Sequence, residues 1–171
     1  MTPPQIILGV VVVQRLVELL TARRNTERLL AQGAVEYGAS HYPFIVLLHA
    51  AWLIALALAV PANAAISVPW LVVFIVLQLG RLWVIVTLGR YWTTRVISLP
   101  GARLVRHGPY RYVRHPNYLI VAGEIAVLPL VFGEWVIASV FSLLNALVLR
   151  ERIAVEERAL AARDKIIPSG N

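Results

Sequence analysis

The chain has 171 residues, of which 59% are hydrophobic and 15% are charged, and its formal net charge is +7. Soluble domains are about 45–50% apolar, so the composition argues against a soluble globular protein. The chain has no cysteine, which excludes a disulfide framework, a thiolate nucleophile and a cysteine metal site. Its length predicts a single domain over residues 1–171. All basic residues except Lys165 are arginines that lie between long apolar runs, so we expect a lipid bilayer as partner and no nucleic acid.

Long apolar segments predict an all-α integral membrane protein with five hydrophobic helices. No Lys, Arg, Asp or Glu occurs between Glu36 and Arg81, a stretch far longer than the roughly 20 residues that cross a bilayer. Proline-containing breaks at 61–63 and 67–69 divide it in two. The last two helices, joined around Gly133 and Glu134, are expected to form a tight hairpin. The predicted helices lie near 4–20, 42–60, 68–88, 119–132 and 136–149.

The positions of the arginines predict the orientation in the membrane. Connections 61–67 and 133–135 contain no basic residue, and basic residues favour the cytoplasmic side. With five crossings, we expect the N-terminus outside, and the C-terminus and the basic segments in the cytoplasm, in a bacterial inner membrane. The basic residues that support this orientation are Arg23, Arg24, Arg28, Arg90, Arg95, Arg103, Arg106, Arg111, Arg114, Arg150, Arg152, Arg158, Arg163 and Lys165.

The segment between the third and fourth helices reads LVRHGPYRYVRHPNY over residues 104–118. Its Gly-Pro and His-Pro pairs predict two turns. Pro116 can open the next helix, which places His115 and Asn117 at a helix N-terminus, where free N–H groups favour an anion. The arginines of this segment can also bind anionic lipid headgroups. We expect no metal site, because His107 and His115 have no nearby carboxylate or thiol to complete the coordination.

This segment, together with RIAVEERAL over residues 152–160 after the hairpin, resembles the signature of the isoprenylcysteine carboxyl methyltransferase family. The resemblance extends over about 89–160, with the catalytic signature within 101–160, and is strongest to short bacterial members, including alkylpyrone and alkylresorcinol O-methyltransferase-like proteins. Members are integral-membrane enzymes that use S-adenosylmethionine. The resemblance therefore implies a cytosolic cofactor-binding segment and methyl transfer to an oxygen of a lipophilic small molecule or a prenylated acceptor.

The resemblance also implies roles for individual residues. Glu156 would bind the amino group of the cofactor, and Arg152 would lie against the acceptor, so that these two form the catalytic pair. The cofactor would be bound by Leu104, Val105, Tyr110, His115, Pro116, Asn117, Tyr118 and Glu156. Two features depart from the family pattern: Ile120 replaces a usual glycine, and the aromatic-Gly-acidic-Tyr tail of the eukaryotic members is absent.

The chemistry is consistent with these residues. Methyl transfer from a sulfonium depends on alignment and exclusion of water, and an acidic acceptor oxygen needs only an arginine such as Arg152 to hold it. A plain phenol would need a base, for which the sequence offers His107, His115 or the pair Glu156 and Glu157. The alternative for that glutamate pair is a solvated helix face.

Four charged residues fall inside the apolar segments: Arg15, Glu18, Arg81 and Glu124. Each costs at least about 2–3 kcal/mol at the bilayer centre unless it is paired. Arg15 and Glu18 share a helix face and are expected to pair, and Arg81 can pair with Glu124. We expect Arg81 and Glu124 to bind substrate if they face inward, whereas snorkelling is the alternative for the two arginines.

Two rival functions follow from other features of the sequence. One is N-methylation of a phospholipid amine, although the Gly-x-Gly element common in that family is absent. The other is a non-enzymatic small membrane transporter built around the four intramembrane charges. The sequence predicts neither the acceptor's identity, nor the oligomeric state, nor what Arg95 contacts.

Overall fold

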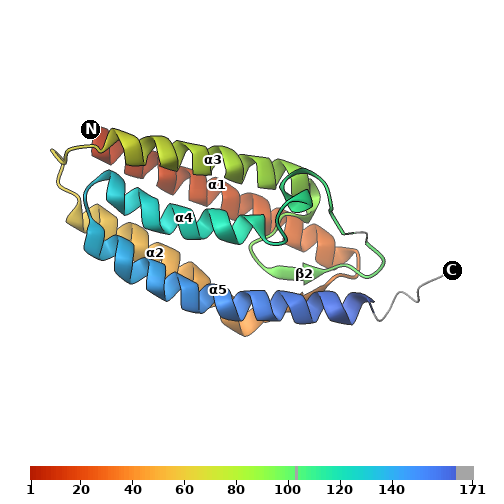
Figure 1. The fold of residues 1–171 in the computed structure, drawn as a ribbon. Coiled ribbons are helices and arrows are strands. Elements are labelled where there is room, and N and C mark those ends of the chain that lie inside the picture. Colours follow the sequence, from red (N-terminus) through yellow and green to blue (C-terminus); the bar gives the residue numbers. More distant parts are fainter. Residues whose placement is uncertain (103, 165–171) are drawn as a thin grey trace.

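The part of the chain that the structure describes folds into five long helices connected by short 3-10 turns and two short strands (Figure 1). The computed structural model describes residues 1–102 and 104–164, so that Arg103 and Lys165 of the predicted basic segments lie outside the described residues. The long helices are α1 (Pro3–Ala31), α2 (Tyr42–Ala59), α3 (Val68–Leu88), α4 (Pro116–Val131) and α5 (Trp135–Asp164). The shorter elements are β1 (Val35–Tyr37), η1 (Ala39–His41), η2 (Gly89–Tyr91), β2 (Val96–Ser98) and η3 (Gly108–Arg111).

The mostly helical fold is confirmed, with one correction to the all-α prediction. Strands β1 and β2 form a two-stranded antiparallel ribbon in which Val35 pairs with Ser98 and Tyr37 with Val96. Three-residue strands carry little periodic signal, and pairing across about sixty residues depends on the helices that bring the strands together. The ribbon joins the connection after α1 to the connection after α3.

Three helical segments are long and apolar enough to cross a membrane: Pro3–Ala31, Ala39–Ala59 and Val68–Tyr91. Only 17% of the most apolar window of each segment is buried within the protein. Most apolar side chains of these helices are therefore at least partly exposed on the surface of the protein, which is typical of helices surrounded by lipid rather than by water. The protein is therefore an integral membrane protein, while five crossings and a terminal hairpin stay a prediction.

The first and last helices extend well beyond the predicted segments. Helix α1 continues to Ala31 rather than ending near residue 20, and α5 continues to Asp164 rather than ending near residue 149. Both extensions are rich in Arg, Glu, Ala and Leu, which favour helix strongly. Hydropathy predicts only the part of a helix that prefers lipid. The polar extensions lie beyond that part and contribute residues to the candidate site described below.

The shortest apolar helix, α4, lies at the centre of the protein and packs mainly against α3 and α5 (Figure 1). Ten of its residues are buried, among them Ile125 and Leu128. These join Trp52 of α2 and Phe74 of α3 in the main hydrophobic core. Because α4 starts at Pro116, its burial fixes the position of the signature segment that precedes it.

The polar connections gather at one end of the helix bundle. The N-terminus and the 61–67 loop lie at one end in Figure 1, whereas β2, residues 99–102 and 104–115, and the described end of α5 lie at the other. The predicted basic segments therefore share one end, and the neutral loops lie at the opposite end.

Candidate functional site

The signature segment is held against α1 and α3. Gly108, at the start of η3, has φ +58, and an added Cβ atom would lie 2.7 Å from Thr87 Oγ1 of α3. The buried Asn25 of α1 donates its side-chain amide to the carbonyl oxygens of Gly89 and Trp92, at 3.2 and 2.9 Å. The segment therefore leaves α3, makes contact with α1, and returns across the end of the bundle to begin α4.

The returning segment encloses a cavity of ≈ 770 Å³, within the size range of small-molecule sites. Every residue predicted to bind the cofactor lines it except Pro116, which is buried as the first residue of α4. Arg106 and Trp92 also contribute to the wall. The cavity-lining members of the predicted set are Leu104, Val105, Tyr110, His115, Asn117, Tyr118 and Glu156, together with Arg152.

A compact polar cluster on α4 and α5 forms one wall of this cavity. The Tyr118 hydroxyl donates to Glu156 Oε2 and accepts a hydrogen bond from Arg152 Nε at 3.0 Å. Arg152 Nη2 donates to the carbonyl oxygen of Thr94 at 2.7 Å. The His115 ring stacks on Tyr118, with centroids 5.5 Å apart, and its Nδ1 lies 3.7 Å from Glu156 Oε1. The packing of α4 against α5 thus brings residues about forty positions apart into one contiguous site.

Three buried polar atoms from cavity-lining residues have no hydrogen-bond partner within the described part of the chain: Trp92 Nε1, His115 Nε2 and Asn117 Oδ1. Buried polar groups normally find a partner. These atoms therefore offer two ring nitrogens and one carbonyl acceptor to a bound molecule. Burial, and then the charge of Glu156, raises the pKa of Tyr110 above its usual value near 10, so Tyr110 remains neutral at physiological pH.

A second, smaller cavity of ≈ 250 Å³ lies between α2, α5 and the ribbon. It shares Arg95, Val96 and Arg152 with the larger cavity. Arg95 donates from Nη1 to both carboxylate oxygens of Glu36 at 2.9 Å, and its guanidinium carbon lies 4.6 Å from the centre of the Tyr42 ring. Two arginines and one strand residue therefore form a common wall between the cavities.

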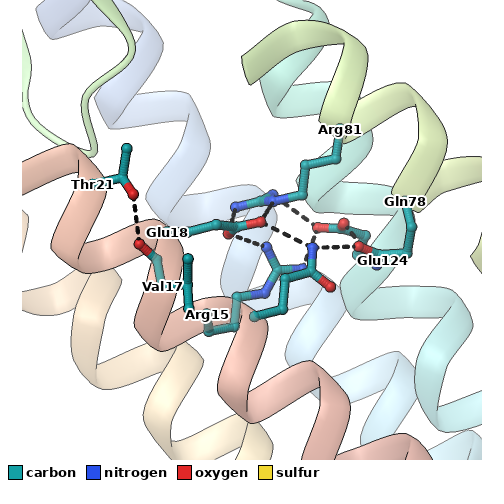
Figure 2. A network of polar contacts seen from close by, with 8 residues as sticks. Arg15, Val17, Glu18, Thr21, Gln78, Arg81 and Glu124 are labelled. Carbon is teal, nitrogen blue, oxygen red and sulfur yellow. Dashed lines mark hydrogen bonds and ion pairs between the residues drawn. The ribbon is translucent and has the colours of Figure 1, made fainter. Parts of the chain in front are cut away.

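The four intramembrane charges form a separate buried network that joins α1, α3 and α4 (Figure 2). Arg15 binds Glu18 and Glu124 at 2.8 and 2.9 Å, and Arg81 binds the same two carboxylates at 2.6 and 3.0 Å. Gln78 also donates to Glu124 at 3.0 Å. Both predicted pairs are confirmed, and burial of Arg15 and Arg81 excludes snorkelling.

Neither Arg81 nor Glu124 lines either of the two cavities described above. Their polar groups are directed at each other and at Glu18, as Figure 2 shows. Contact between these two residues and a substrate therefore stays a prediction.

A family comparison identifies the signature segment. A model of the isoprenylcysteine carboxyl methyltransferase (ICMT) family matches residues 70–162. These include α4, most of α3 and α5, and every described lining residue of the larger cavity except Leu29 of α1. The chain belongs to the ICMT family. The family and the apolar helices together make it a membrane methyltransferase.

Two bacterial relatives extend the similarity over nearly the whole chain. The uncharacterized protein YpbQ of Bacillus subtilis (strain 168) is 38% identical over 159 residues, which are 91% of this chain and 95% of the relative. An uncharacterized protein of Haemophilus influenzae is 29% identical over 154 residues, 86% of this chain and 88% of the relative. No solved structure gives a significant match. The similarity to these two bacterial proteins thus extends beyond the ICMT region to the helices that precede it.

Four residues at this ICMT site were not predicted from the sequence: Asn25, Glu36, Tyr42 and Thr94. Asn25 anchors the turn after α3, Glu36 binds Arg95, and the Tyr42 hydroxyl lies 3.1 Å from Thr94 Oγ1. All but Thr94 come from segments before the matched region and meet their partners across more than fifty residues. The one local signal in the sequence is a polar residue such as Asn25, which lies shortly after a predicted helix and has no predicted partner.

Proposed function

We propose that the protein is an S-adenosylmethionine-dependent methyltransferase that methylates an oxygen of a lipophilic acceptor. The observation that carries the proposal is the convergence of the signature segment with Arg152 and Glu156 around the ≈ 770 Å³ cavity. ICMT family methyltransferases generally use this cofactor. A solvated helix face alone would not bring these residues around one cavity.

The residues of the larger cavity fit the parts of the cofactor. Glu156 supplies a carboxylate for the ammonium group, and the faces of Tyr110, Tyr118 and His115 can stabilise a sulfonium by about 0.5–2 kcal/mol. Leu104 and Val105 give an apolar surface for the adenosine, while the unpartnered Asn117 Oδ1 offers an acceptor to an amino group. Pro116 would act indirectly, by starting α4 and so placing Asn117.

Bound S-adenosylmethionine supplies a methyl group on a positively charged sulfur, which is reactive toward an oxyanion. Arg152 holds and orients that oxyanion, since its guanidinium is fixed by Tyr118 and by the Thr94 carbonyl. Because Arg152 can hold an oxyanion without removing a proton, the site best serves an acceptor that is already ionised, such as a carboxylic acid or an acidic enol. The positive charge of Arg152 disfavours a phospholipid amine as acceptor.

We also propose that the candidate site lies at the cytoplasmic face. The basic segments share the end of the bundle that carries the larger cavity (Figure 1), and basic residues favour the cytoplasm. The N-terminus then lies outside, and the five helices cross or enter the bilayer in alternating directions.

Calorimetric binding of S-adenosylhomocysteine to the detergent-purified protein tests the cofactor assignment. We expect saturable binding to the wild type. In Glu156→Gln, loss of a charge-assisted hydrogen bond, about 1.5–3 kcal/mol, weakens binding roughly 10- to 100-fold. His115→Ala is expected to weaken binding as well, because it removes both a ring face and Nε2 from the cavity.

Two neighbouring variants serve as matched controls. Glu157 and His107 lie beside or near the predicted residues but do not line the larger cavity. Glu157→Gln and His107→Ala should therefore bind with an affinity close to that of the wild type. A folded wild-type protein that binds no S-adenosylhomocysteine, or equal losses in all four variants, would refute the assignment.

A further inference from the structure

We propose that Tyr42, the first residue of α2, is a positioning residue that holds the guanidinium of Arg152 in place through Thr94. This inference rests on the proposed function, in which Arg152 orients the acceptor oxyanion. The ICMT match covers residues 70–162, so Thr94 and Arg152 lie inside the matched region and Tyr42 lies outside it. A helix that precedes the matched region thereby contributes to the geometry of the candidate site.

Arg152 is held by two neutral oxygen atoms. Its Nε donates to the Tyr118 hydroxyl at 3.0 Å, and its Nη2 donates to the Thr94 carbonyl oxygen at 2.7 Å. Since neither oxygen carries a formal charge, these contacts fix the guanidinium without neutralising it, and its charge stays available for an oxyanion. The direction of the guanidinium therefore depends on the position of the Thr94 carbonyl.

The carboxylates near Arg152 have other partners. Both oxygens of Glu36 accept hydrogen bonds from Arg95 Nη1 at 2.9 Å. Glu151, next to Arg152 on α5, lies 3.5 Å from Arg158 Nη2. The smaller cavity is lined by these two carboxylates as well as by Arg95 and Arg152, so its four charges balance. Within the described part of the chain, Arg152 differs from Arg95 in having no carboxylate partner within 4 Å.

Tyr42 is the group that fixes Thr94. Thr94 lies in a bend between η2 and β2, outside the regular hydrogen bonding of a helix or a strand. Its hydroxyl forms a hydrogen bond of 3.1 Å with the Tyr42 hydroxyl. The Tyr42 ring is held in turn by Arg95, whose guanidinium carbon lies 4.6 Å from the ring centre, a cation–π contact. A continuous path of contacts therefore leads from Tyr42 through Thr94 to Arg152.

Modification by phenylglyoxal measures how firmly Arg152 is held, without requiring turnover. The reagent bridges two nitrogens of one guanidinium, so an arginine whose Nη2 is hydrogen-bonded reacts slowly. The detergent-purified protein is treated for increasing times, and the modification of each arginine is followed by peptide mass spectrometry. Tyr42→Phe removes the hydroxyl and keeps the ring. We expect Arg152 to react about 2- to 10-fold faster in this variant, the range that one neutral hydrogen bond contributes.

A matched variant and two internal standards separate this effect from a general loosening of the protein. Tyr37→Phe makes the same change on β1, away from Thr94, and should leave the Arg152 rate unchanged. Arg81, 9% exposed in the buried network of Figure 2, and Arg158, 70% exposed, should react at wild-type rates in both variants. A merely structural effect of Tyr42→Phe would accelerate Arg81 as well, and that result would overturn the inference.

A double-mutant cycle tests whether Thr94 carries the effect. Thr94→Val removes the hydroxyl and keeps the carbonyl, so it should accelerate Arg152 as much as Tyr42→Phe does. The double variant Tyr42→Phe/Thr94→Val should react no faster than either single variant, because both changes remove the same hydrogen bond. An unchanged Arg152 rate in either single variant, or a double variant in which the two accelerations multiply, would contradict the inference.

Calorimetric binding of S-adenosylhomocysteine keeps this inference apart from the function on which it rests. If the wild type binds the compound and Arg152 reacts equally fast in the wild type and in Tyr42→Phe, only the positioning inference is wrong. If the wild type binds none while Tyr42→Phe accelerates Arg152, the path of contacts is established. The methyltransferase function is then wrong, and with it the role of Arg152 toward an acceptor.

Discussion

Arg152 is the residue on which the two cavities converge. Its Nε and Nη2 groups are bound within the protein, at 3.0 and 2.7 Å, so the plane of the guanidinium is fixed before any ligand arrives. A guanidinium fixed in advance can hold an oxyanion with little further loss of side-chain freedom. Tyr118 has a linking role, since its hydroxyl hydrogen-bonds to both Arg152 and Glu156.

At the same scale, Gly108 is expected to tolerate no side chain. In Gly108→Ala the backbone at φ +58 is strained by about 1–2 kcal/mol, and the new Cβ would meet Thr87 Oγ1 at 2.7 Å and Cγ2 at 3.0 Å. We expect a lower thermal unfolding temperature in detergent and weaker binding of S-adenosylhomocysteine.

Two further variants separate the causes of the Gly108 effect. Gly101 also has positive φ, +75, but a Cβ atom added there would meet no atom of the described residues within 4 Å. Gly101→Ala should therefore show only the cost of the backbone strain. Adding Thr87→Ala to Gly108→Ala removes the crowded atoms and should recover part of the loss. If Gly108→Ala, Gly101→Ala and the double variant all lowered the unfolding temperature and the binding affinity equally, η3 would not be closely packed on α3.

At the scale of elements, the buried charge network ties α1, α3 and α4 together. Two arginines and two glutamates balance, and each carboxylate binds both arginines (Figure 2). In a low-dielectric layer, a buried charge without a partner is costly, so the four charges are stable together only when all of them are present. The network therefore fixes the relative rotation and depth of three helices, and thereby the position of α4 beneath the signature segment.

Charge balance should dominate the response to mutation of this network. Glu124→Leu leaves Arg15 and Arg81 with one carboxylate, and loss of one partner of a buried ion pair costs about 3–5 kcal/mol. The double variant Arg81→Met/Glu124→Leu leaves Arg15 with Glu18, so it should recover much of the lost stability. Thermal unfolding in detergent measures both, and a double variant less stable than Glu124→Leu would contradict the prediction.

At the scale of the whole molecule, the two ends of the bundle differ in charge. The end with the ribbon and the candidate cavities carries the basic C-terminal part of α1, the polar part of α5 and the described parts of the connection between α3 and α4. The opposite end carries the neutral 61–67 loop (Figure 1). In the proposed orientation, a polar cofactor would reach the larger cavity from the cytoplasm, and a lipophilic acceptor would approach the site from the bilayer.

Single-cysteine labelling tests this orientation, and the natural absence of cysteine removes any background. A membrane-impermeant maleimide should label Asn63→Cys on intact spheroplasts, since this residue lies in the outer loop. His107→Cys, on the exposed surface of the signature segment, should be labelled only after the membrane is permeabilised. The reverse pattern would place the candidate site outside the cytoplasm.

The sequence by itself determined the membrane environment, the family and the residues that gather around the larger cavity, because these depend on local composition and on a contiguous signature. It also determined two intramembrane ion pairs, since an unpaired charge in lipid is too costly. Only the tertiary structure decided that these pairs merge into one network, that a small ribbon forms, and that Glu36, Tyr42 and Thr94 hold the arginines of a second cavity. Such contacts join segments more than fifty residues apart, and helix packing, which no local pattern encodes, brings them together.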